Sequence, residues 1–529
     1  MPRISIDGRE IEVPPGATIL DAARRLGIDI PTLCHRDGCE PSCSCLVCVV
    51  RVRGQKRFVP SCATRAVEGM EVESETDEVH RARRMALELL LGDHLGDCVA
   101  PCELSCPLHM DIPSMLRQIR DGEWGKAIAT IKRDIALPAV LGRVCPKPCE
   151  KACRRGVADG AVAICALKGQ TAEIDLASDA PYAPPCKPDS GRRVAVVGAG
   201  PCGLAAAFHL AQAGHRVTLL DDQPQPGGRL RHEFDASTLP RDLLDAEMAQ
   251  VLRLGAEVRL STSIGDKTAF DQLRNRYDAV LVCCGVQGKE PCAPWGLTGN
   301  QGAVQIEKGT YRTNLDGVFA AGSVVRNKTS VVRSVADGKE AAVAIDAFLC
   351  GSSTDASRRP FTVRAGRLAP EEVSVMIEQV ETFSDVPEAS TSALEEARRQ
   401  AARCLHCDCR GRNDCRLKLH AEQYDARPTH YQGARRELVL LRGNSGVLYE
   451  PGKCIDCGLC IQIASSRRDL LGLTFIGRGF DVRVGVPFDG SLDEALGELA
   501  AECVAACPTA ALSMDTPRLA SELPILGPS

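Results

Sequence analysis

Cysteines are concentrated in short clusters along this chain, and this is the strongest constraint that its sequence carries. The 529 residues include 28 cysteines, and at least nineteen of them fall into five groups. The groups are Cys34/Cys45/Cys48/Cys62, Cys98/Cys102/Cys106, Cys145/Cys149/Cys153/Cys165, Cys404/Cys407/Cys409/Cys415, and Cys454/Cys457/Cys460 with Cys507. A thiolate is a soft, anionic ligand, and an iron–sulfur cluster needs four such ligands held close together. The clustering therefore predicts several metal sites that store and relay single electrons.

Length and composition predict a soluble protein of several domains. Single hydrophobic cores rarely grow beyond roughly 250–300 residues, and 44% apolar and 25% charged residues are usual for globular proteins. The net charge of −5 favours neither nucleic acid nor an anionic membrane as a partner. We see no run of the roughly 18–20 apolar residues that a membrane span needs, and no signal peptide. Because disulfides suit small secreted domains, we expect a cytoplasmic, metal-binding protein.

Residues 1–76 predict a [2Fe–2S] ferredoxin domain. Residues 3–13 alternate around the hairpin signal Asp7-Gly8, and a helix is expected from Thr18 to about Leu26. The cysteine spacing in this segment resembles that of the β-grasp [2Fe–2S] domain in the electron-entry subunit of complex I and in related hydrogenases and formate dehydrogenases. The resemblance implies four ligands, which are Cys34, Cys45, Cys48 and Cys62. Cys39 and Cys43 share the loop and are expected to be spare thiols.

Residues 77–186 predict an amphipathic helix ending near Gly92, followed by an α-helical domain with two [4Fe–4S] clusters. The segments CVAPCELSCPLHMDIP and GRVCPKPCEKAC resemble the N-terminal domain of the glutamate synthase small subunit and of dihydropyrimidine dehydrogenase. The resemblance implies one cluster on Cys106, Cys145, Cys149 and Cys165, and a second on Cys102, Cys153, Cys98 and His94. Cys98 and His94 enter because the two earliest cysteines of that family have no counterpart here. His94 is alternatively a surface histidine favoured by the dipole at a helix C-terminus.

Residues 190–350 predict a Rossmann-like FAD domain. A buried strand runs into a glycine-rich turn and a helix, and an acidic residue follows the second strand. Glycines let a backbone approach a pyrophosphate, and the acid accepts ribose hydroxyls. The expected cofactor-binding residues are Gly198, Gly200, Gly203, Asp221, Gly227, Gly228, Arg229, Gly322 and Ser323. In the flavoproteins that this segment resembles, an Asp contacts the ribityl chain where Ser323 stands, so we expect FAD to bind with altered affinity.

A domain found in the glutamate synthase small subunit is missing from this sequence. In that family an NADPH-binding Rossmann domain is inserted between two halves of the FAD domain. Here about thirty residues separate Gly285 from Asn314, which leaves room for at most one βαβ unit. No second GxGxxG motif is present. We therefore expect the chain not to bind NAD(P)H by itself.

Two further cysteine-rich segments follow the expected linker at 351–400. In 401–430, Cys404, Cys407, Cys409 and Cys415 are expected to hold one [4Fe–4S] cluster, with a structural zinc ion as the alternative. Residues 440–515 resemble a bacterial ferredoxin in which one of two cluster sites remains. In two-cluster ferredoxins the cysteine before a proline ligates the distant cluster. That rule pairs Cys507 with Cys454, Cys457 and Cys460 and leaves Cys503 free.

These segments predict a multidomain α/β and α+β protein that carries one [2Fe–2S] cluster, three to four [4Fe–4S] clusters and FAD. We expect an electron-transfer subunit of a cytoplasmic NAD(P)H-linked oxidoreductase. Its expected partners are a complex I-like subunit that binds FMN and NADH, and a hydrogenase, formate dehydrogenase or ferredoxin. A second hypothesis is a self-contained NADPH-dependent enzyme of the glutamate synthase small-subunit type. A third is a scaffold without redox activity whose flavin site has degenerated.

Overall fold

The computed structural model forms two compact units that do not follow the order of the predicted domains. It describes residues 1–285, 293–300, 302–327, 329–352, 355, 360–382, 392–431, 433–466, 471–488 and 490–514. Unit 1 comprises residues 1–99, 361–368 and 408–529, and unit 2 comprises residues 100–360 and 369–407. Unit 1 therefore joins the first and last predicted domains. Parts of the predicted linker (353–354, 356–359 and 383–391) and residue 515 of the last predicted domain lie outside the described residues.

The N-terminal part of unit 1 is a five-stranded mixed sheet with one helix. Its elements are β1 (Arg3–Ile6), β2 (Arg9–Glu12), α1 (Ile19–Arg25), β3 (Val49–Val52), β4 (Phe58–Pro60) and β5 (Glu71–Glu73), and the strand order is β2-β1-β5-β3-β4. Asp7 and Gly8 have φ of 50° and 79°, and two positive φ values are what a tight hairpin turn requires. Thr18 and Asp21 form a capping box at the start of α1, so the predicted hairpin and helix are both present.

The rest of unit 1 follows a long helix. Helix α2 (Asp77–Gly92) ends where the sequence predicts, and α17 (Arg416–Gln423) packs against it. The guanidinium of Arg83 is fully buried and donates to the Val49 carbonyl at 3.1 Å and the Tyr424 hydroxyl at 2.8 Å. The C-terminal part contains β13 (Leu441–Arg442), β14 (Val447–Tyr449), η3 (Pro451–Lys453), α18 (Leu459–Ser465), β15 (Thr474–Ile476), η4 (Gly479–Asp481), β16 (Arg483–Gly485), α19 (Leu492–Leu496), η5 (Gly497–Leu499), α20 (Ala500–Ala506) and β17 (Leu512–Met514).

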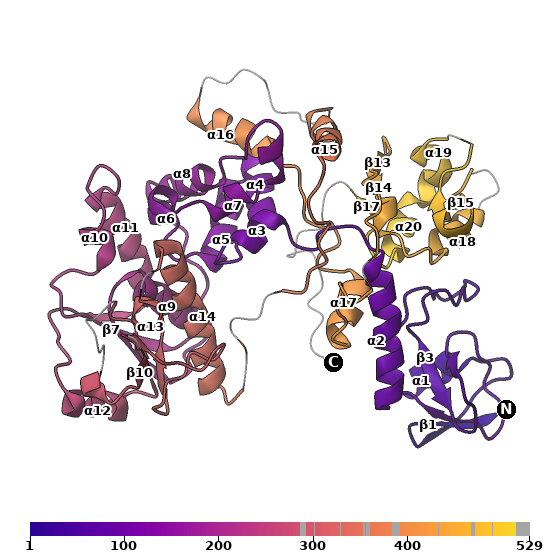
Figure 1. The fold of residues 1–529 in the computed structure, drawn as a ribbon, viewed down its shortest axis with the longest axis horizontal. Helices are drawn as coiled ribbons and strands as arrows, with labels where there is room; N and C mark the ends of the chain where they lie inside the picture. The colour runs from indigo at the N-terminus through magenta and orange to yellow at the C-terminus, as the bar shows by residue number, and fades with distance from the viewer. Residues whose placement is uncertain are drawn as a thin grey trace. The chain divides into compact units, whose positions relative to one another are not determined.

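Unit 2 begins with a group of short helices (Figure 1). They are α3 (Pro101–Ser105), α4 (Ile112–Arg120), α5 (Trp124–Asp134), α6 (Pro138–Val144), α7 (Pro148–Lys151), η1 (Arg154–Val157) and α8 (Ile164–Leu176), joined from later in the chain by α15 (Pro370–Thr382) and α16 (Ala393–Ala402). Helix α16 packs against α4, and α15 packs against η1. The two helices that precede Cys404 therefore belong to this helical group.

The second part of unit 2 is a parallel sheet of order β12-β9-β6-β7-β8. Its elements are β6 (Arg193–Val197), α9 (Pro201–Gln212), β7 (Arg216–Leu220), α10 (Arg229–His232), α11 (Arg241–Leu252), β8 (Glu257–Arg259), α12 (Lys267–Arg276), β9 (Ala279–Val282), η2 (Ala293–Trp295), β10 (Gly299–Asn300), β11 (Ala303–Val304), β12 (Val318–Ala320), α13 (Ser323–Arg326) and α14 (Val331–Leu349). Ligands of such sheets bind beyond the carboxyl ends of the strands. Among the described residues no helix is both long and apolar enough to cross a membrane.

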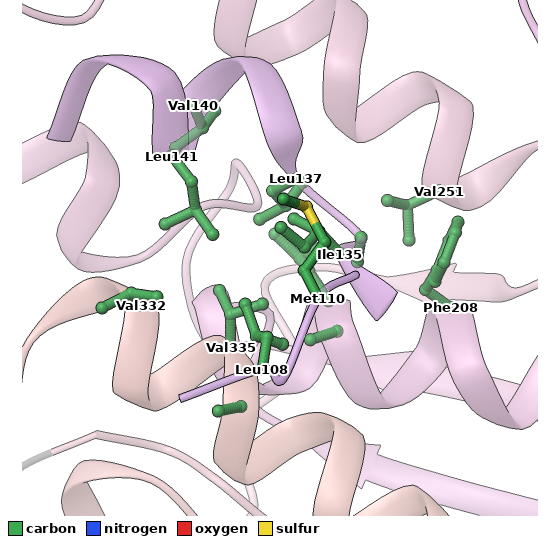
Figure 2. Close-up of a cluster of buried hydrophobic side chains, with 14 of the residues drawn as sticks. Leu108, Met110, Ile135, Leu137, Val140, Leu141, Phe208, Val251, Val332 and Val335 are labelled. Atoms are coloured by element: carbon green, nitrogen blue, oxygen red, sulfur yellow. The ribbon is translucent and has the colours of Figure 1, made fainter. Parts of the chain in front are cut away.

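The helical group and the parallel sheet of unit 2 share one hydrophobic core (Figure 2). Leu108, Met110 and Ile135 from the helical group pack with Phe208 and Val335 from the sheet part. Burial of each such side chain stabilises the fold by roughly 1.5–3 kcal/mol. Unit 2 therefore holds its cysteine-rich helices and its sheet in one fixed arrangement.

A buried carboxylate reinforces this joint. Glu247 of α11 is 2% exposed and accepts hydrogen bonds from the backbone N–H groups of Ala139 and Val140, at 2.6 and 2.7 Å. Burial raises the pKa of Glu247 to about 7 although both N–H donors favour the charged form. The two N–H groups lie at the start of α6, so this carboxylate connects the sheet part to the helix that leads into Cys145.

We expect Glu247→Ala to destabilise unit 2 by about 2–3 kcal/mol, because two buried N–H groups would lose their acceptor. Anaerobic urea unfolding of the full chain, followed by circular dichroism, measures the effect. Asp242→Ala changes an exposed carboxylate of the same helix and should cost no more than about 1 kcal/mol. Equal losses for the two variants would contradict a special role for Glu247.

Candidate cluster and flavin sites

Three cysteines of the N-terminal loop, which joins α1 to β3, lie together with Cys62, which follows β4, and the four form two pairs. Cys34, Cys45, Cys48 and Cys62 are each at most 3% exposed. A hydrogen bond with Cys45 lowers the pKa of Cys34 to about 5, and one with Cys62 lowers the pKa of Cys48 to about 6. A two-iron cluster needs four thiolates, and this buried set of two close pairs fits that need.

A fifth thiol lies at the same site. Cys43 forms a side-chain hydrogen bond with Cys62, and burial raises the pKa of the Cys43 thiol. Its backbone is left-handed, with φ of 53°. From the sequence spacing we expect both Cys39 and Cys43 to be spare thiols, and no local pattern distinguishes the two. Only the folded structure shows that Cys43 lies beside the ligand set.

The structure brings together the first predicted set of the helical group, which we call the first quartet. Cys106, Cys145, Cys149 and Cys165 line a cavity of about 20 Å³. Helices α6 and α8 approach closely because Gly142 faces Gly169, where a Cβ on Gly142 would lie 2.6 Å from the Gly169 Cα. The close crossing brings Cys165, in the first turn of α8, next to Cys145, with which it shares a hydrogen bond. Burial raises the pKa of Cys149 to about 12.

The second set differs from the prediction. Cys102 and Cys153 line a cavity of about 30 Å³ together with Cys404 and Cys407, and we call these four the second quartet. Burial raises the pKa of Cys102, and the neighbouring thiols of Cys404, Cys407 and Cys153 raise it further. Neither Cys98 nor His94 lines this cavity, because both belong to unit 1.

Packing of α16 explains the corrected set. The Arg398 guanidinium donates to the Arg120 carbonyl at 2.9 Å, and the Arg155 guanidinium donates to the Arg403 carbonyl at 2.7 Å. These bonds fix the end of α16 against α4 and η1, so Cys404 and Cys407 lie beside Cys153. Cys404 and Cys407 thus take the positions of the two earliest cysteines of the family, which have no counterpart at the start of this segment. The only signal in the sequence is local: the segment Gln-Ala-Ala-Arg at 400–403 leads directly into Cys404-x2-Cys407.

The predicted single site at 401–430 is therefore divided. Cys404 and Cys407 belong to unit 2, whereas Cys409 and Cys415 belong to unit 1. In unit 1 the pKa of Cys415 is raised to about 12. Burial is the main cause, and the nearby thiols of Cys409 and Cys98 raise it further. These three cysteines lie close together and form the third set.

His94 lies near this third set, around a buried lysine. The Lys453 ammonium acts electrostatically on His94, Cys98 and Cys409. The Nδ1 atom of His94 is buried without a hydrogen-bond partner among the described residues, and burial lowers the pKa of His94 to about 4. A neutral imidazole with a vacant nitrogen suits a metal ligand. The structure thus groups His94 with Cys98, as predicted, but with Cys409 and Cys415 instead of Cys102 and Cys153.

The C-terminal set agrees with the ferredoxin pairing. Cys454, Cys457, Cys460 and Cys507 line a cavity of about 20 Å³, and we call them the C-terminal quartet. Cys503 is fully buried nearby and does not line that cavity. Within unit 1 the charge of Cys34 raises the pKa of Cys457, and the charge of Cys507 raises the pKa of Cys415, so the thiols of each pair lie near each other. The C-terminal quartet therefore lies between the N-terminal loop and the third set.

The quartets fit clusters better than single ions. In the described part of the chain no three His, Cys, Asp or Glu side chains are grouped as a single metal ion would need. In each of these three cavities the four cysteines line the same enclosed space, which is the arrangement that a thiolate-bound cluster needs.

The predicted flavin residues surround a large cavity of unit 2. It measures about 980 Å³ and is lined by Gly198, Gly200, Asp221, Gly228, Arg229 and Ser323 among others. The Asp221 carboxylate accepts from the Ala199 N–H at 2.6 Å and lies at the end of β7. Gly203, Gly227 and Gly322 support the cavity from outside its lining. The residues fit FAD by size and chemistry, since pockets for such ligands measure roughly 300–1,000 Å³.

Two details of the cavity support this fit. A Cβ on Gly203 would lie 1.8 Å from the Gly198 carbonyl oxygen, so only glycine allows α9 to start this close to the turn. The Ser334 hydroxyl lines the cavity and is buried without a hydrogen-bond partner among the described residues. Sequence reasoning missed Ser334. A hydroxyl in this position can donate to a bound flavin, as Ser323 can.

The flavin cavity and the first quartet are neighbours. Thr329 and Ser334 line the flavin cavity, whereas Val332, between them in the chain, lines the cavity of the first quartet. The first turn of α14 therefore separates the two cavities. One short backbone segment is a suitable path for an electron between them.

Comparison with known families assigns three segments. Residues 2–77 match the 2Fe-2S iron-sulfur cluster binding domain, residues 94–179 match the 4Fe-4S domain II of dihydropyrimidine dehydrogenase, and residues 160–338 match the pyridine nucleotide-disulphide oxidoreductase domain. The chain is built from iron–sulfur and flavin oxidoreductase domains. These matches confirm the cofactor types [2Fe–2S], [4Fe–4S] and FAD for the segments that they cover.

Curated relatives match about a third of the chain. The β subunit of NADP(+)-dependent formate dehydrogenase from Moorella thermoacetica is 37% identical over 35% of this chain, and the match spans 29% of the relative. The β subunit of NADPH-Fe(3+) oxidoreductase from Geobacter sulfurreducens is 35% identical over 36% of the chain and 29% of the relative. The glutamate synthase [NADPH] small chain of Mycobacterium tuberculosis is 36% identical over 36% and 39%. The chain thus spans less than half the length of these relatives.

Proposed function

We propose that the chain is an electron-transfer iron–sulfur flavoprotein subunit of a cytoplasmic NAD(P)H-linked oxidoreductase complex. The observation that carries the proposal is the succession of a flavin cavity and cysteine sets along the fold. FAD exchanges two electrons with a hydride-type donor and passes them on singly. The protein's own part is to space these sites, exclude water from them and dock the partners.

The ligand sets of the proposal follow the structure. We assign the [2Fe–2S] cluster to Cys34, Cys45, Cys48 and Cys62, in a domain whose mixed sheet and single helix support the β-grasp fold. We assign four [4Fe–4S] clusters to the first quartet, the second quartet, the C-terminal quartet, and the third set with His94 as fourth ligand. All of these side chains come from described residues.

The covalent chain supports electron exchange between the second quartet and the third set. Cys407 of the former and Cys409 of the latter are separated only by Asp408. Consecutive Cα atoms are about 3.8 Å apart, so the Cα atoms of Cys407 and Cys409 cannot be more than about 7.6 Å apart in any conformation. The sites that they ligate are therefore held near each other by the backbone itself.

Contacts within unit 1 continue this path toward the N-terminal loop. The side-chain amide of Gln462 in α18 donates to the Glu40 carbonyl at 3.0 Å, and Arg36 pairs with Glu502 at 2.8 Å. These bonds fasten the [2Fe–2S] loop to the C-terminal quartet's domain. The proposed order is flavin, first quartet, second quartet, third set, C-terminal quartet and [2Fe–2S] cluster, and electrons can run along it in either direction.

Partners of two kinds complete the proposal. Relatives named as subunits of formate dehydrogenase and of an Fe(3+) oxidoreductase support a multi-subunit complex. The short segment between Gly285 and Asn314 supports a separate nicotinamide-binding partner, which we expect to resemble the FMN- and NADH-binding subunits of complex I. A hydrogenase, formate dehydrogenase or ferredoxin would serve the other end of the path.

The test is the reduction of the purified chain without oxygen. We expect neither NADH nor NADPH to bleach the visible spectrum of flavin and clusters, because the segment between Gly285 and Asn314 is too short for an inserted nicotinamide domain. Dithionite should bleach both. Stopped-flow absorbance of the flavin and cluster bands follows the reaction. Bleaching by NADPH alone would favour the self-contained enzyme instead, and a colourless purified chain would favour the scaffold.

A further inference from the structure

One charged side chain lines the cavity of the first quartet. Apart from the four cysteines, the described lining consists of Lys168 and of apolar residues such as Leu108, Met110 and Val332. Lys168 lies one helical turn after Cys165 in α8 and is 5% exposed. Its ammonium donates to the Cys165 Sγ at 3.5 Å. A buried cation thus lies directly against a proposed ligand sulfur.

The Lys168 ammonium forms no direct ion pair with a carboxylate of the described residues. No described Asp or Glu lies within ion-pair distance of its ammonium, whereas the nearby buried Lys132 pairs with Asp175 at 2.6 Å. The Lys168 charge opposes the rise in the pKa of Glu247, and the charge of Glu150 acts on Cys165, but both carboxylates are engaged with other groups. Glu150 accepts from the Cys165 N–H at 2.8 Å and lies 3.8 Å from the Lys147 ammonium, and Glu247 accepts from the α6 backbone.

The second quartet differs in this respect. Its cavity is lined by Arg154 and Arg155, and the buried Arg155 guanidinium forms an ion pair with Asp159 at 2.6 Å. Of these two cations, Arg155 is therefore directly compensated by a carboxylate. Two neighbouring four-cysteine sites of one unit thus have different electrostatic surroundings, although their ligand atoms are the same.

We propose that Lys168 sets the reduction potential of the first quartet's cluster, making it the site that takes electrons most readily from the flavin. Reduction adds one negative charge to a cluster that its four thiolates already make anionic. A buried ammonium and its hydrogen bond to a ligand sulfur stabilise the reduced form more than the oxidised form. In a site from which water is excluded, this interaction is weakly screened. The inference rests on the proposed ligand set of the first quartet.

The experiment is an anaerobic redox titration of the full chain, followed by electron paramagnetic resonance. The signal of the first quartet is identified by its loss in Cys149→Ser. In Lys168→Met we expect the equilibrium constant for one-electron reduction of that cluster to fall at least about tenfold, a shift of about 59 mV to lower potential. Lys168→Gln, which keeps an N–H donor without the charge, should show most of the shift. The other signals should keep their midpoints.

Two controls complete the design. Lys168→Arg keeps the cation and should leave the midpoint within a threefold change of the wild type. Lys126→Met removes an exposed lysine of α5 that pairs with Glu123 and should change nothing. An assembled cluster with an unchanged midpoint in Lys168→Met would overturn the inference, and so would loss of the signal in every Lys168 variant, which shows a role in assembly. Absence of the signal from the wild type would instead refute the proposed ligand set.

Discussion

Replacement of Cys404 by serine should remove the same [4Fe–4S] signal as replacement of Cys153, because both line the cavity of the second quartet. Cys409→Ser should remove a different signal, that of the third set. Each change should cost one cluster's complement of iron, since a four-ligand site with one ligand removed no longer holds its cluster stably. Iron analysis and electron paramagnetic resonance of the anaerobically purified chain measure both quantities.

Exposed cysteines provide the matched controls. Cys186 and Cys350 are exposed and line none of the cysteine cavities, so Cys186→Ser and Cys350→Ser should keep full iron content. The corrected partition would be wrong if Cys404→Ser and Cys409→Ser abolished one common signal. That outcome would restore the single site at Cys404, Cys407, Cys409 and Cys415 that the local spacing suggests.

Gly203→Ala should abolish flavin binding. A Cβ at this position would lie 1.8 Å from the Gly198 carbonyl oxygen, which is backbone and has no rotamer with which to move away. The turn between β6 and α9 would open, and the surface that approaches the pyrophosphate would be lost. We expect the flavin content per chain to fall at least about tenfold, a loss of about 1.4 kcal/mol or more in binding free energy.

Gly125→Ala is the control for this change. Gly125 is exposed in α5, and nothing lies within 4 Å of a Cβ placed there, so alanine should be neutral or slightly stabilising. Flavin released by heat denaturation and measured by fluorescence gives the content of both variants. Full flavin content in Gly203→Ala, with iron unchanged, would show that the cofactor does not rest on this turn.

Local patterns were sufficient wherever the ligands of a site are close in sequence. The spacing from Cys34 to Cys62 identified a site whose four thiols are buried together, and Gly198 to Asp221 identified the lining of the flavin cavity. In both cases one short, continuous segment of the chain carries the chemistry. Such segments form through short-range hydrogen bonds and steric limits, and these depend on residue types that can be recognised directly in the sequence.

Residues that act across long separations were not predictable in the same way. Cys404 and Cys407 join Cys102 and Cys153 only because α16 packs against α4. In the sequence alone, Cys409 and Cys415 follow Cys404 and Cys407 so closely that the four cysteines indicate a single site. Lys168 and Ser334 likewise have no motif, because their importance comes from burial beside a cavity.

The sequence by itself determined the kinds of site in this protein: thiolate sets, a glycine-rich flavin turn and the domains that carry them. Only the tertiary structure decided which cysteines share a site, that the chain divides between Cys407 and Asp408, and which charges lie beside each set. The reason is physical. Ligand type and local turn geometry depend on neighbouring residues, whereas a ligand set assembled from distant segments depends on how helices bury their apolar faces against one another.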